Sequence, residues 1–345
     1  MSGFDNPLPT GQLTRPDVPC VIDMHGHCGA PEAEALLASR PERAAEMGAQ
    51  ARSTGAASSQ HNRTVMLPAA GARMASLEKR LADLDLMGVD VQLVAPSPHL
   101  YAYWADEGLA GELVAVVNAA AVALVARAPE RLAGMGMVSM QYPDLAAQQI
   151  HAAKAAGLKG IEISASVGER ELSDPVFTPV WAAAEETGLP VFIHPLGTSL
   201  GARLDRFYLS NTIGQPVETT IALTGLILSG VLDRHPRLKL VGAHGGGYLP
   251  AYIGRADHTW CVRPEARGCA ALPSEYLSRI WVDTVVFDRT QLSDLVQRMG
   301  ADRVMFGTDY PFDMADCRPD QVAAALPLSA RAAVMGGTAA ALFNL

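Results

Sequence analysis

Two histidines stand one residue apart in the stretch VIDMHGHCGAP, residues 21–31, at the end of an apolar run. On a β-strand, side chains at positions i and i+2 point to the same face, so His25 and His27 would project together. Two imidazoles on one face make half of a metal site. The alternative is that one histidine bonds to a backbone carbonyl in the core and the other lies in a solvated loop. The rest of the chain has to decide between them.

Three more polar residues end apolar runs in the same way. His194 follows PVFI, His244 follows LKLVGA, and Asp309 stands in VMFGTDYP. If the runs are parallel strands of one barrel, their ends meet at one rim. Histidine and carboxylate ligands suit a borderline ion such as Zn²⁺, with one position left open for water. A single histidine at a strand end is usually structural, but five polar positions on one rim favour a bound divalent metal ion, zinc by preference.

The apolar runs alternate with segments of helical spacing. Runs rich in β-branched residues occupy residues 21–27, 89–98, 132–140, 158–164, 190–195, 238–247, 279–286 and 304–311. Between them, Ala-, Leu- and Glu-rich segments predict helices at residues 74–87, 109–128, 144–156 and 176–186. This alternation predicts an α/β fold, a (β/α)₈ TIM barrel, with residues 1–345 as a single domain. An open doubly wound sheet is the competing fold, but no GxGxxG motif follows the first run.

Two segments interrupt the alternation. Residues 28–72 include the polar stretch ARSTGAASSQHNRT, and residues 196–217 read LGTSLGARLDRFYLSNTIGQPV. Both begin where a strand ends, at the face of a barrel that carries active sites, and the first is too long for a simple loop. We therefore expect an excursion after strand one, with residues 28–72 as a lid insertion over the barrel mouth. Mobile surface loops are the alternative.

The overall composition argues against several classes of protein. A net charge of -9 and the lack of a basic stripe argue against nucleic-acid binding. No run of about 18 or more apolar residues occurs, and the N-terminus has no apolar leader, so we expect no membrane association. The five cysteines are scattered without a CxxC pair, which suits a reducing compartment. The sequence thus predicts a cytoplasmic protein.

Several of these motifs occur together in one known family. The HxH pair, the lone histidine after the fifth run, HGGG at residues 244–247 and GTDYP at residues 307–311 resemble the amidohydrolase superfamily. The resemblance is to the branch that contains α-amino-β-carboxymuconate-ε-semialdehyde decarboxylase, and it runs from Val21 to the C-terminal GGTAAALFNL. Its most specific part is residues 215–260, which begin QPVETTIALTGLILSG.

The resemblance implies a role for each of the strand-end residues. It implies that the metal ligands are His25, His27, His194 and Asp309. It also implies that His244 is the acid/base residue beside them, with Asp309 contributing to catalysis as well as to metal binding.

The resemblance also implies that arginines bind a carboxylate of a small-molecule substrate. Arg255, in YIGR, would reach the cavity of the neighbouring subunit, so the working unit would be a homodimer or a higher homo-oligomer. Arg63, in SQHNRTVML, corresponds loosely to a second such arginine. The alternative for Arg255 is a surface ion pair with Asp257 or Glu265.

Two further carboxylates stand on predicted strands. Asp283, in IWVDT, is expected to hold a ligand histidine or to orient the site. Glu162 is near the place where some superfamily members have a carboxylate that bridges a second metal. The decarboxylase branch uses one metal, so we expect Glu162 to line the cavity or cap a loop.

These residues predict a metal-dependent, non-oxidative decarboxylase of an unsaturated or aromatic carboxylic acid in ring-cleavage catabolism. Bound zinc lowers the pKa of its water toward about 7, so a zinc-bound hydroxide would exist at neutral pH. His244 would accept and return the proton, because histidine titrates near that pH. The same groups would serve a hydrolase of a lactone, amide or C–C bond, which is the second candidate. A non-catalytic metal-binding barrel is the third.

Overall fold

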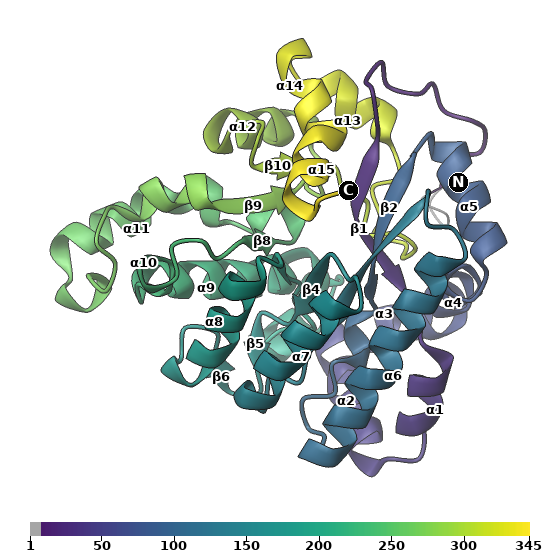
Figure 1. The fold of residues 1–345 in the computed structure, drawn as a ribbon, viewed down its shortest axis with the longest axis horizontal. Helices are drawn as coiled ribbons and strands as arrows, with labels where there is room; N and C mark the ends of the chain where they lie inside the picture. The colour runs from purple at the N-terminus through teal and green to yellow at the C-terminus, as the bar shows by residue number, and fades with distance from the viewer. Residues whose placement is uncertain (1–7) are drawn as a thin grey trace.

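The computed structural model describes residues 8–345, and within them the predicted strands form one parallel eight-stranded sheet (Figure 1). The strands follow one another around the sheet in the order β1 (Ile22–Cys28), β2 (Val91–Pro96), β3 (Leu132–Met137), β4 (Gly160–Ile163), β7 (Val191–Ile193), β8 (Leu240–Gly242), β9 (Ile280–Asp283) and β10 (Val304–Met305). Neighbouring strands pair in parallel throughout. With helices outside the sheet, this order confirms the predicted (β/α)₈ TIM barrel.

The first and last strands close the barrel through backbone hydrogen bonds. The N–H of Met24 donates to the carbonyl of Phe306 at 2.9 Å, and the N–H of Asp309 donates to the carbonyl of His25 at 2.8 Å. The register of β1 against β2 shifts between Asp23 and Gly26, as at a β-bulge. Closure places the HxH pair directly beside the residues that follow β10.

Helices cover the outside of the barrel. After the insertion described below they are α5 (Leu77–Met87), α6 (Glu107–Ala126), α7 (Pro143–Ala155), α8 (Thr178–Thr187), α9 (Gln215–Leu228), α10 (Val231–Arg234), α11 (Leu249–Val262), α12 (Arg289–Met299), α13 (Pro319–Ala325), α14 (Leu328–Ala332) and α15 (Thr338–Phe343). The side chains of Ser76, Asp106 and Asp288 cap the first turns of α5, α6 and α12. The four segments predicted to be helical are α5 to α8.

Two apolar layers stabilise the barrel. Inside it, side chains from different strands, such as Met24, Leu93, Phe192 and Met305, form one fully buried cluster that includes residues of α15. A larger cluster fills the space between the strands and the outer helices. The strands are therefore buried on both faces, as their continuous apolar runs predicted.

The insertion after β1 is helical. It contains α1 (Pro31–Leu37), α2 (Pro41–Thr54), α3 (Ala56–His61), a π-helical turn (Asn62–Met66) and α4 (Leu67–Met74). A short hairpin of β5 (Ser166–Val167) and β6 (Arg170–Glu171) follows β4, and the segment after β7 contains a 3₁₀ turn (Gly201–Leu204) and a π-helical turn (Ser210–Gly214). Met47 and Leu67 of the insertion and Tyr208 of the segment after β7 line one cavity with His194. Both segments thus lie over the ends of the strands.

By length and composition alone, α6 could cross a membrane. In the barrel it packs on β3, with Leu113, Val114 and Val117 buried. Asn118 exchanges two hydrogen bonds with the backbone of Met137, at 3.1 and 2.8 Å. This is the packing of a helix on the outside of the barrel.

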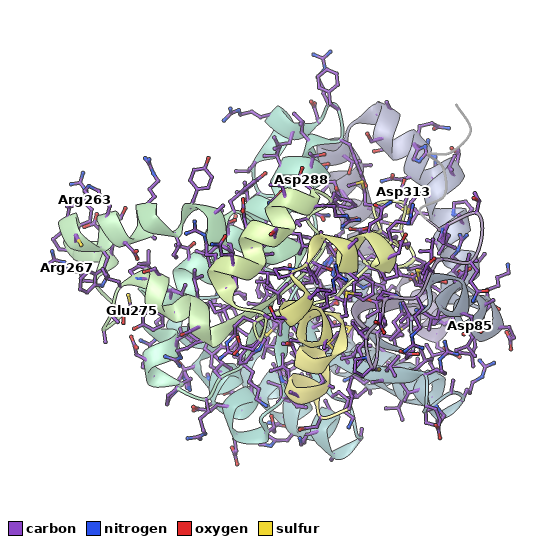
Figure 2. The ribbon with its side chains drawn as sticks, turned by 90° about the horizontal axis from the view of Figure 1, so that it is seen from above. Asp85, Arg263, Arg267, Glu275, Asp288 and Asp313 are labelled. Atoms are coloured by element: carbon purple, nitrogen blue, oxygen red, sulfur yellow. The ribbon has the colours of Figure 1, made fainter. Side chains whose placement is uncertain are left out.

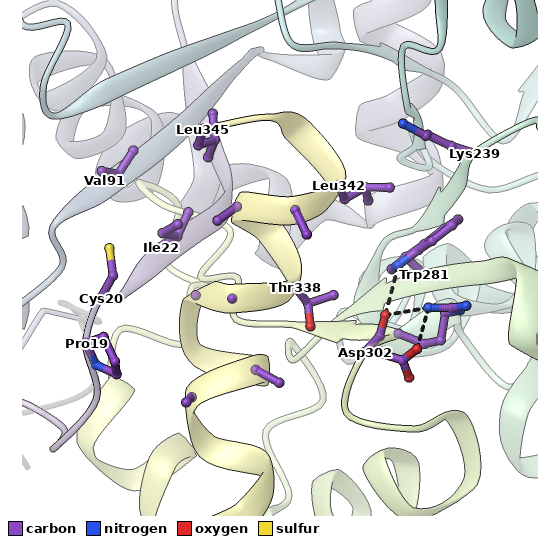
Figure 3. Close-up of a pocket in the computed structure, with 17 residues that line it drawn as sticks. Pro19, Cys20, Ile22, Val91, Lys239, Trp281, Asp302, Thr338, Leu342 and Leu345 are labelled. Atoms are coloured by element: carbon purple, nitrogen blue, oxygen red, sulfur yellow. Dashed lines mark hydrogen bonds and ion pairs between the residues drawn. The ribbon is translucent and has the colours of Figure 1, made fainter.

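A cavity of about 820 Å³ lies at the end of the barrel where the strands begin (Figure 3). Ile22, Trp281 and Leu342 contribute to its largely apolar wall. Arg303, at its edge, pairs with Asp302 at 2.7 Å. The strand-end residues singled out by the sequence lie at the opposite end of the barrel.

Candidate metal centre and active-site cavity

Four strand-end side chains converge at the barrel mouth. One potential ligand atom from each of His25, His27, His194 and Asp309 lies within 4.8 Å of the others, and all four residues are buried. Nε2 of His27 is 3.2 Å from Nε2 of His25 and 3.1 Å from Oδ1 of Asp309. The two histidines of the HxH pair point to the same space, as their spacing predicted.

The ring nitrogens of His194 are available to bind a cation. Both of its ring nitrogens are buried without a hydrogen-bond partner among residues 8–345. Leaving a buried polar atom unpaired costs about 1–3 kcal/mol. Burial, and then the neighbouring His27 and His25, hold the pKa of His194 well below its usual range, so this ring is neutral. Three imidazoles with a carboxylate fit a divalent metal ion, because a neutral ring nitrogen offers a lone pair.

Asp283, at the end of β9, supports the centre from behind. Its Oδ2 lies 2.7 Å from Nδ1 of His25. The same carboxylate accepts hydrogen bonds from the backbone N–H groups of His244, Gly245 and Val285, at 3.0, 2.8 and 3.0 Å. Asp283 was expected to hold a ligand histidine or to orient the site, and its contact is with His25. One carboxylate therefore holds His25 and the turn that carries His244 in a fixed relation.

His244 lies beside the cluster. Its Nε2 is 3.6 Å from Oδ2 of Asp309, and the centroid of its ring is 5.0 Å from that of His194. Burial lowers the pKa of His244, but its close contact with the carboxylate of Asp309 and the charges of Asp309 and Asp283 outweigh burial, and the pKa is raised. Burial also raises the pKa of Asp309, but the charge of His25, the contact with His244 and the hydrogen bond from His27 outweigh burial and hold it well below its usual range.

Two of the seven non-glycine residues with a positive φ in the described chain are these same two positions. His244 has a φ of 56° and Asp309 a φ of 62°, in the left-handed region that residues with a side chain rarely adopt. Such strain costs about 1–3 kcal/mol per residue and clusters at functional sites. Gly247, in HGGG, also has a positive φ, and a Cβ there would lie 2.2 Å from the carbonyl oxygen of Pro216. The turn after β8 therefore requires glycine for close packing against the start of α9.

A cavity of about 380 Å³ leads to the centre. His194 and Asp309 line it, and apolar side chains from the two excursions and from the loop after β10 complete its wall, among them Met47, Leu67, Leu196, Phe312 and Met314. A second lobe of about 340 Å³ is lined by His244 and also by Asp309. His244, His194 and Asp309 thus line two adjoining lobes, and Asp309 borders both of them.

One wall of this cavity carries a chain of polar contacts that sequence reasoning missed. Oγ of Ser97 lies 2.8 Å from Nδ1 of His99, and Nε2 of His99 contacts the carboxylate of Glu34. Arg43 donates to the carbonyl oxygen of His99 at 2.5 Å and to Glu46 at 3.1 Å. Burial raises the pKa of Glu34, but the hydrogen bond and charge of His99 and the charge of Arg43 outweigh burial and lower it. The chain joins the end of β2 to the insertion helices.

A comparison with known protein families shows to which family the chain belongs. The family described as amidohydrolase matches residues 22–345. The chain belongs to the amidohydrolase family.

The relatives of this chain include several decarboxylases. It is 35% identical over 248 residues to the 2-amino-3-carboxymuconate-6-semialdehyde decarboxylase of Dictyostelium discoideum, covering 70% of this chain and 68% of the relative. It is 32% identical over 239 residues to the γ-resorcylate decarboxylase of Rhodococcus jostii, covering 64% of this chain and 73% of the relative. These relatives confirm the branch of the superfamily that the motifs indicated.

Solved structures of decarboxylases are also similar to this chain. The 5-carboxyvanillate decarboxylase of Sphingomonas paucimobilis is 28% identical, with a TM-score of 0.80 over 94% of this chain and 99% of that one. A second 5-carboxyvanillate decarboxylase, from Novosphingobium aromaticivorans and crystallised with bound manganese, shares the fold at 24% identity and a TM-score of 0.79, over 94% of this chain and 97% of that one.

The two arginines expected to bind substrate are both exposed. The guanidinium of Arg63, on the π-helical turn of the insertion, donates to the side chain of Gln60. Among the described residues, Met66 and Leu67 of the same segment line the cavity, and Arg63 does not.

Arg255 lies on α11, the helix that projects from the barrel in Figure 1. Figure 2 shows Arg263 and Arg267 just beyond the far end of this helix. Asp257, an alternative partner of Arg255, accepts a hydrogen bond from the backbone N–H of Ser274 at 2.8 Å. Within residues 8–345, Arg255 is also not among the side chains that line the cavity.

A buried polar network that the sequence did not predict connects β1 to the loop after β10. Asp23 accepts hydrogen bonds from the hydroxyl of Thr308 at 2.7 Å and from the amide of Gln92 at 2.7 Å. Arg80, on α5, donates to Gln92 and, at 2.6 Å, to the carbonyl oxygen of His27. The network fixes the backbone on which the HxH pair and Asp309 stand.

Proposed function

We propose that this protein is a metal-dependent, non-oxidative decarboxylase of a small unsaturated or aromatic carboxylic acid, acting in ring-cleavage catabolism. The observation that carries the proposal is the buried group of three histidines and a carboxylate with His244 beside it. Its relatives named above are decarboxylases, which favours a carboxy-lyase over the hydrolase and over the non-catalytic barrel.

We propose His25, His27, His194 and Asp309 as the ligands of one divalent ion. Imidazole ligands favour zinc, and manganese is the competitor that the test should include. When bound, the ion would lower the pKa of a water molecule and stabilise negative charge that develops on the substrate. Both ring nitrogens of His194 lack a hydrogen-bond partner within residues 8–345, which supports its role as a ligand, because an unpaired ring nitrogen is free to bind the ion.

His244 is the proposed proton carrier. Loss of CO₂ breaks the bond between the carboxyl carbon and its neighbour, and the electron pair stays on the substrate carbon, which must take up a proton. His244 borders the cavity, and its raised pKa favours a ring that holds a proton near neutral pH. Asp309, held as a carboxylate, would orient that ring as well as bind the metal.

The shape of the site supports a small, flat substrate. A cavity of about 380 Å³ with Phe312, Leu196 and Met314 in its wall suits one unsaturated chain or ring. We propose that Arg255 of a neighbouring subunit binds a substrate carboxylate, because its exposed position on the projecting α11 suits contact with a second molecule. We propose that Arg63 also binds a substrate carboxylate, because Met66 and Leu67 of the same insertion line the cavity.

Two wider features belong to the same proposal. We propose a cytoplasmic enzyme, because its five cysteines are all free thiols and would persist in a reducing compartment. We also propose that residues 28–72 act as a lid within a single barrel domain, since α2 and α4 contribute side chains to the cavity wall.

The proposed function is tested by measuring whether the metal-loaded protein releases CO₂ from carboxylic acids. Metal-free protein would be loaded with zinc or with manganese and incubated with a panel of carboxymuconates and hydroxybenzoates, and with lactones and amides of similar size. We expect CO₂ from at least one acid, no release by metal-free protein, and about one bound metal ion per chain by elemental analysis. Hydrolysis of a lactone or amide with no CO₂ from any acid would contradict the proposal.

A further inference from the structure

Glu162, on β4, faces one of the candidate ligands across a short gap. Its Oε2 lies 3.8 Å from Nδ1 of His27, and both residues are fully buried. Neither of these two atoms has a hydrogen-bond partner within the described part of the chain. They are two buried polar atoms that lie close together, and the backbone carbonyl of Pro96 is the competing acceptor beside the His27 ring.

The other oxygen of Glu162 is already held in place. The hydroxyl of Tyr101 donates to Oε1 at 2.7 Å. The ring of Tyr101 stacks on that of Tyr103, with centroids 5.5 Å apart and planes 8° from parallel. The hydroxyl of Tyr103 accepts a hydrogen bond from the backbone N–H of Ser164, just after β4. The carboxylate is therefore aimed at His27 by groups anchored to its own strand.

The HxH pair offers an internal comparison. Nδ1 of His25 contacts Asp283 at 2.7 Å, which is an ordinary hydrogen-bond distance. The gap between His27 and Glu162 exceeds the usual upper limit of about 3.2 Å by roughly half an ångström. A small movement of the His27 ring would close it.

Metal binding supplies the reason for that movement. An imidazole that binds a metal through Nε2 carries its proton on Nδ1, and this N–H needs an acceptor. We propose that Glu162 is the positioning residue of His27: it accepts the Nδ1–H hydrogen bond, fixes the ring tautomer and aims Nε2 at the metal centre. Glu162 is thus the counterpart of Asp283 for the second histidine of the pair, and Tyr101 holds it in that role. This inference rests on the proposed metal site.

The main variant is Glu162→Gln, which keeps the shape of the side chain and removes its charge. Its amide can donate to Nδ1 of His27 and would then favour the tautomer with the proton on Nε2, the atom needed for the metal. The control is Glu218→Gln on α9, because Glu218 is also a buried carboxylate but binds Thr198 and Ser199 instead of a candidate ligand.

The first readout is the affinity for zinc alone, measured by competition with a chelating dye. We expect Glu162→Gln to bind zinc about 10–100-fold more weakly than the unmodified protein, the usual effect of losing such a support. Tyr101→Phe should weaken binding less but in the same direction, and Glu218→Gln should bind as the unmodified protein does. Thermal unfolding of the metal-free proteins would identify any variant that fails to fold, and Tyr101→Phe then carries the test.

The second readout is the tautomer of His27, taken from its ring nitrogen shifts in ¹H–¹⁵N spectra. We expect the proton on Nδ1 in the zinc-bound protein and on Nε2 in metal-free Glu162→Gln. Equal zinc affinity in Glu162→Gln and the unmodified protein would overturn the inference, and so would an equal loss in Glu218→Gln. A second zinc ion per chain that disappears with Glu162→Gln would also overturn it, because Glu162 would then be a ligand. If the unmodified protein bound no metal, the proposed function itself would fail.

Discussion

Asp283→Asn tests whether one carboxylate holds both His25 and the turn of His244. Each oxygen of Asp283 accepts two hydrogen bonds: Oδ2 from His25 Nδ1 and the N–H of His244, and Oδ1 from the N–H groups of Gly245 and Val285. An asparagine has one such oxygen, so its NH₂ group must face two of these donors in either orientation. Each buried donor left unpaired costs about 1–3 kcal/mol, so one or two of them destabilise the fold by about 1–6 kcal/mol.

The same substitution should weaken the metal site. Without the carboxylate, His25 loses the acceptor that keeps its proton on Nδ1, and zinc affinity should fall about 10–100-fold. Urea unfolding of the metal-free protein measures the first effect, and zinc competition with a chelating dye measures the second. A variant that unfolds within about 0.5 kcal/mol of the unmodified protein, the range of an ordinary surface change, would refute this reasoning if it also bound zinc equally well.

Three further predictions concern the cavity and the neighbouring subunit. His244→Ala should keep its zinc but lose about 10²–10⁴-fold in decarboxylation rate, whereas His25→Ala should lose the zinc itself; zinc loss in the His244 variant would count against its role as the proton carrier. Mixing inactive Arg255→Ala with inactive His244→Ala should restore activity in hybrid dimers, and no recovery despite proven subunit exchange would disprove action across the interface. Because its pKa is lowered in the fold, Glu34 should stabilise the protein above its unfolded pKa of about 4.3 and lose this effect as the pH falls through the folded value. The melting temperature of Glu34→Gln should therefore be below that of the unmodified protein at pH 7, and the difference should shrink as the pH is lowered; a difference independent of pH would contradict this.

The barrel and the members of its central cluster could be predicted from the sequence because both depend on short-range patterns. Continuous apolar runs between helical segments indicate parallel strands buried on both faces, and parallel strands of a barrel all end at one rim. A polar residue directly after such a run is therefore expected to lie at that rim. This is why His194 and Asp309, far apart in the chain, could be expected to lie beside the HxH pair.

The helical insertion shows where this reasoning ends. Residues 28–72 are polar and rich in small residues, which predicted an excursion over the mouth but not α1 to α4. Their contribution to the cavity wall depends on how α2 and α4 pack, and no local pattern carries that information.

The supporting contacts were decided by the tertiary structure alone. Asp283 meets His25 across 258 positions in the chain, and Asp23 meets Thr308 across 285. The position of Glu162 on a strand was evident from the sequence, but its aim toward His27 depends on strand register, on the tyrosines behind it and on side-chain rotamers. The sequence determines which chemical groups reach the rim, because strand periodicity is a local property. Which of those groups face one another at hydrogen-bond distance is settled only when the closed barrel sets the spacing of its strands to within an ångström.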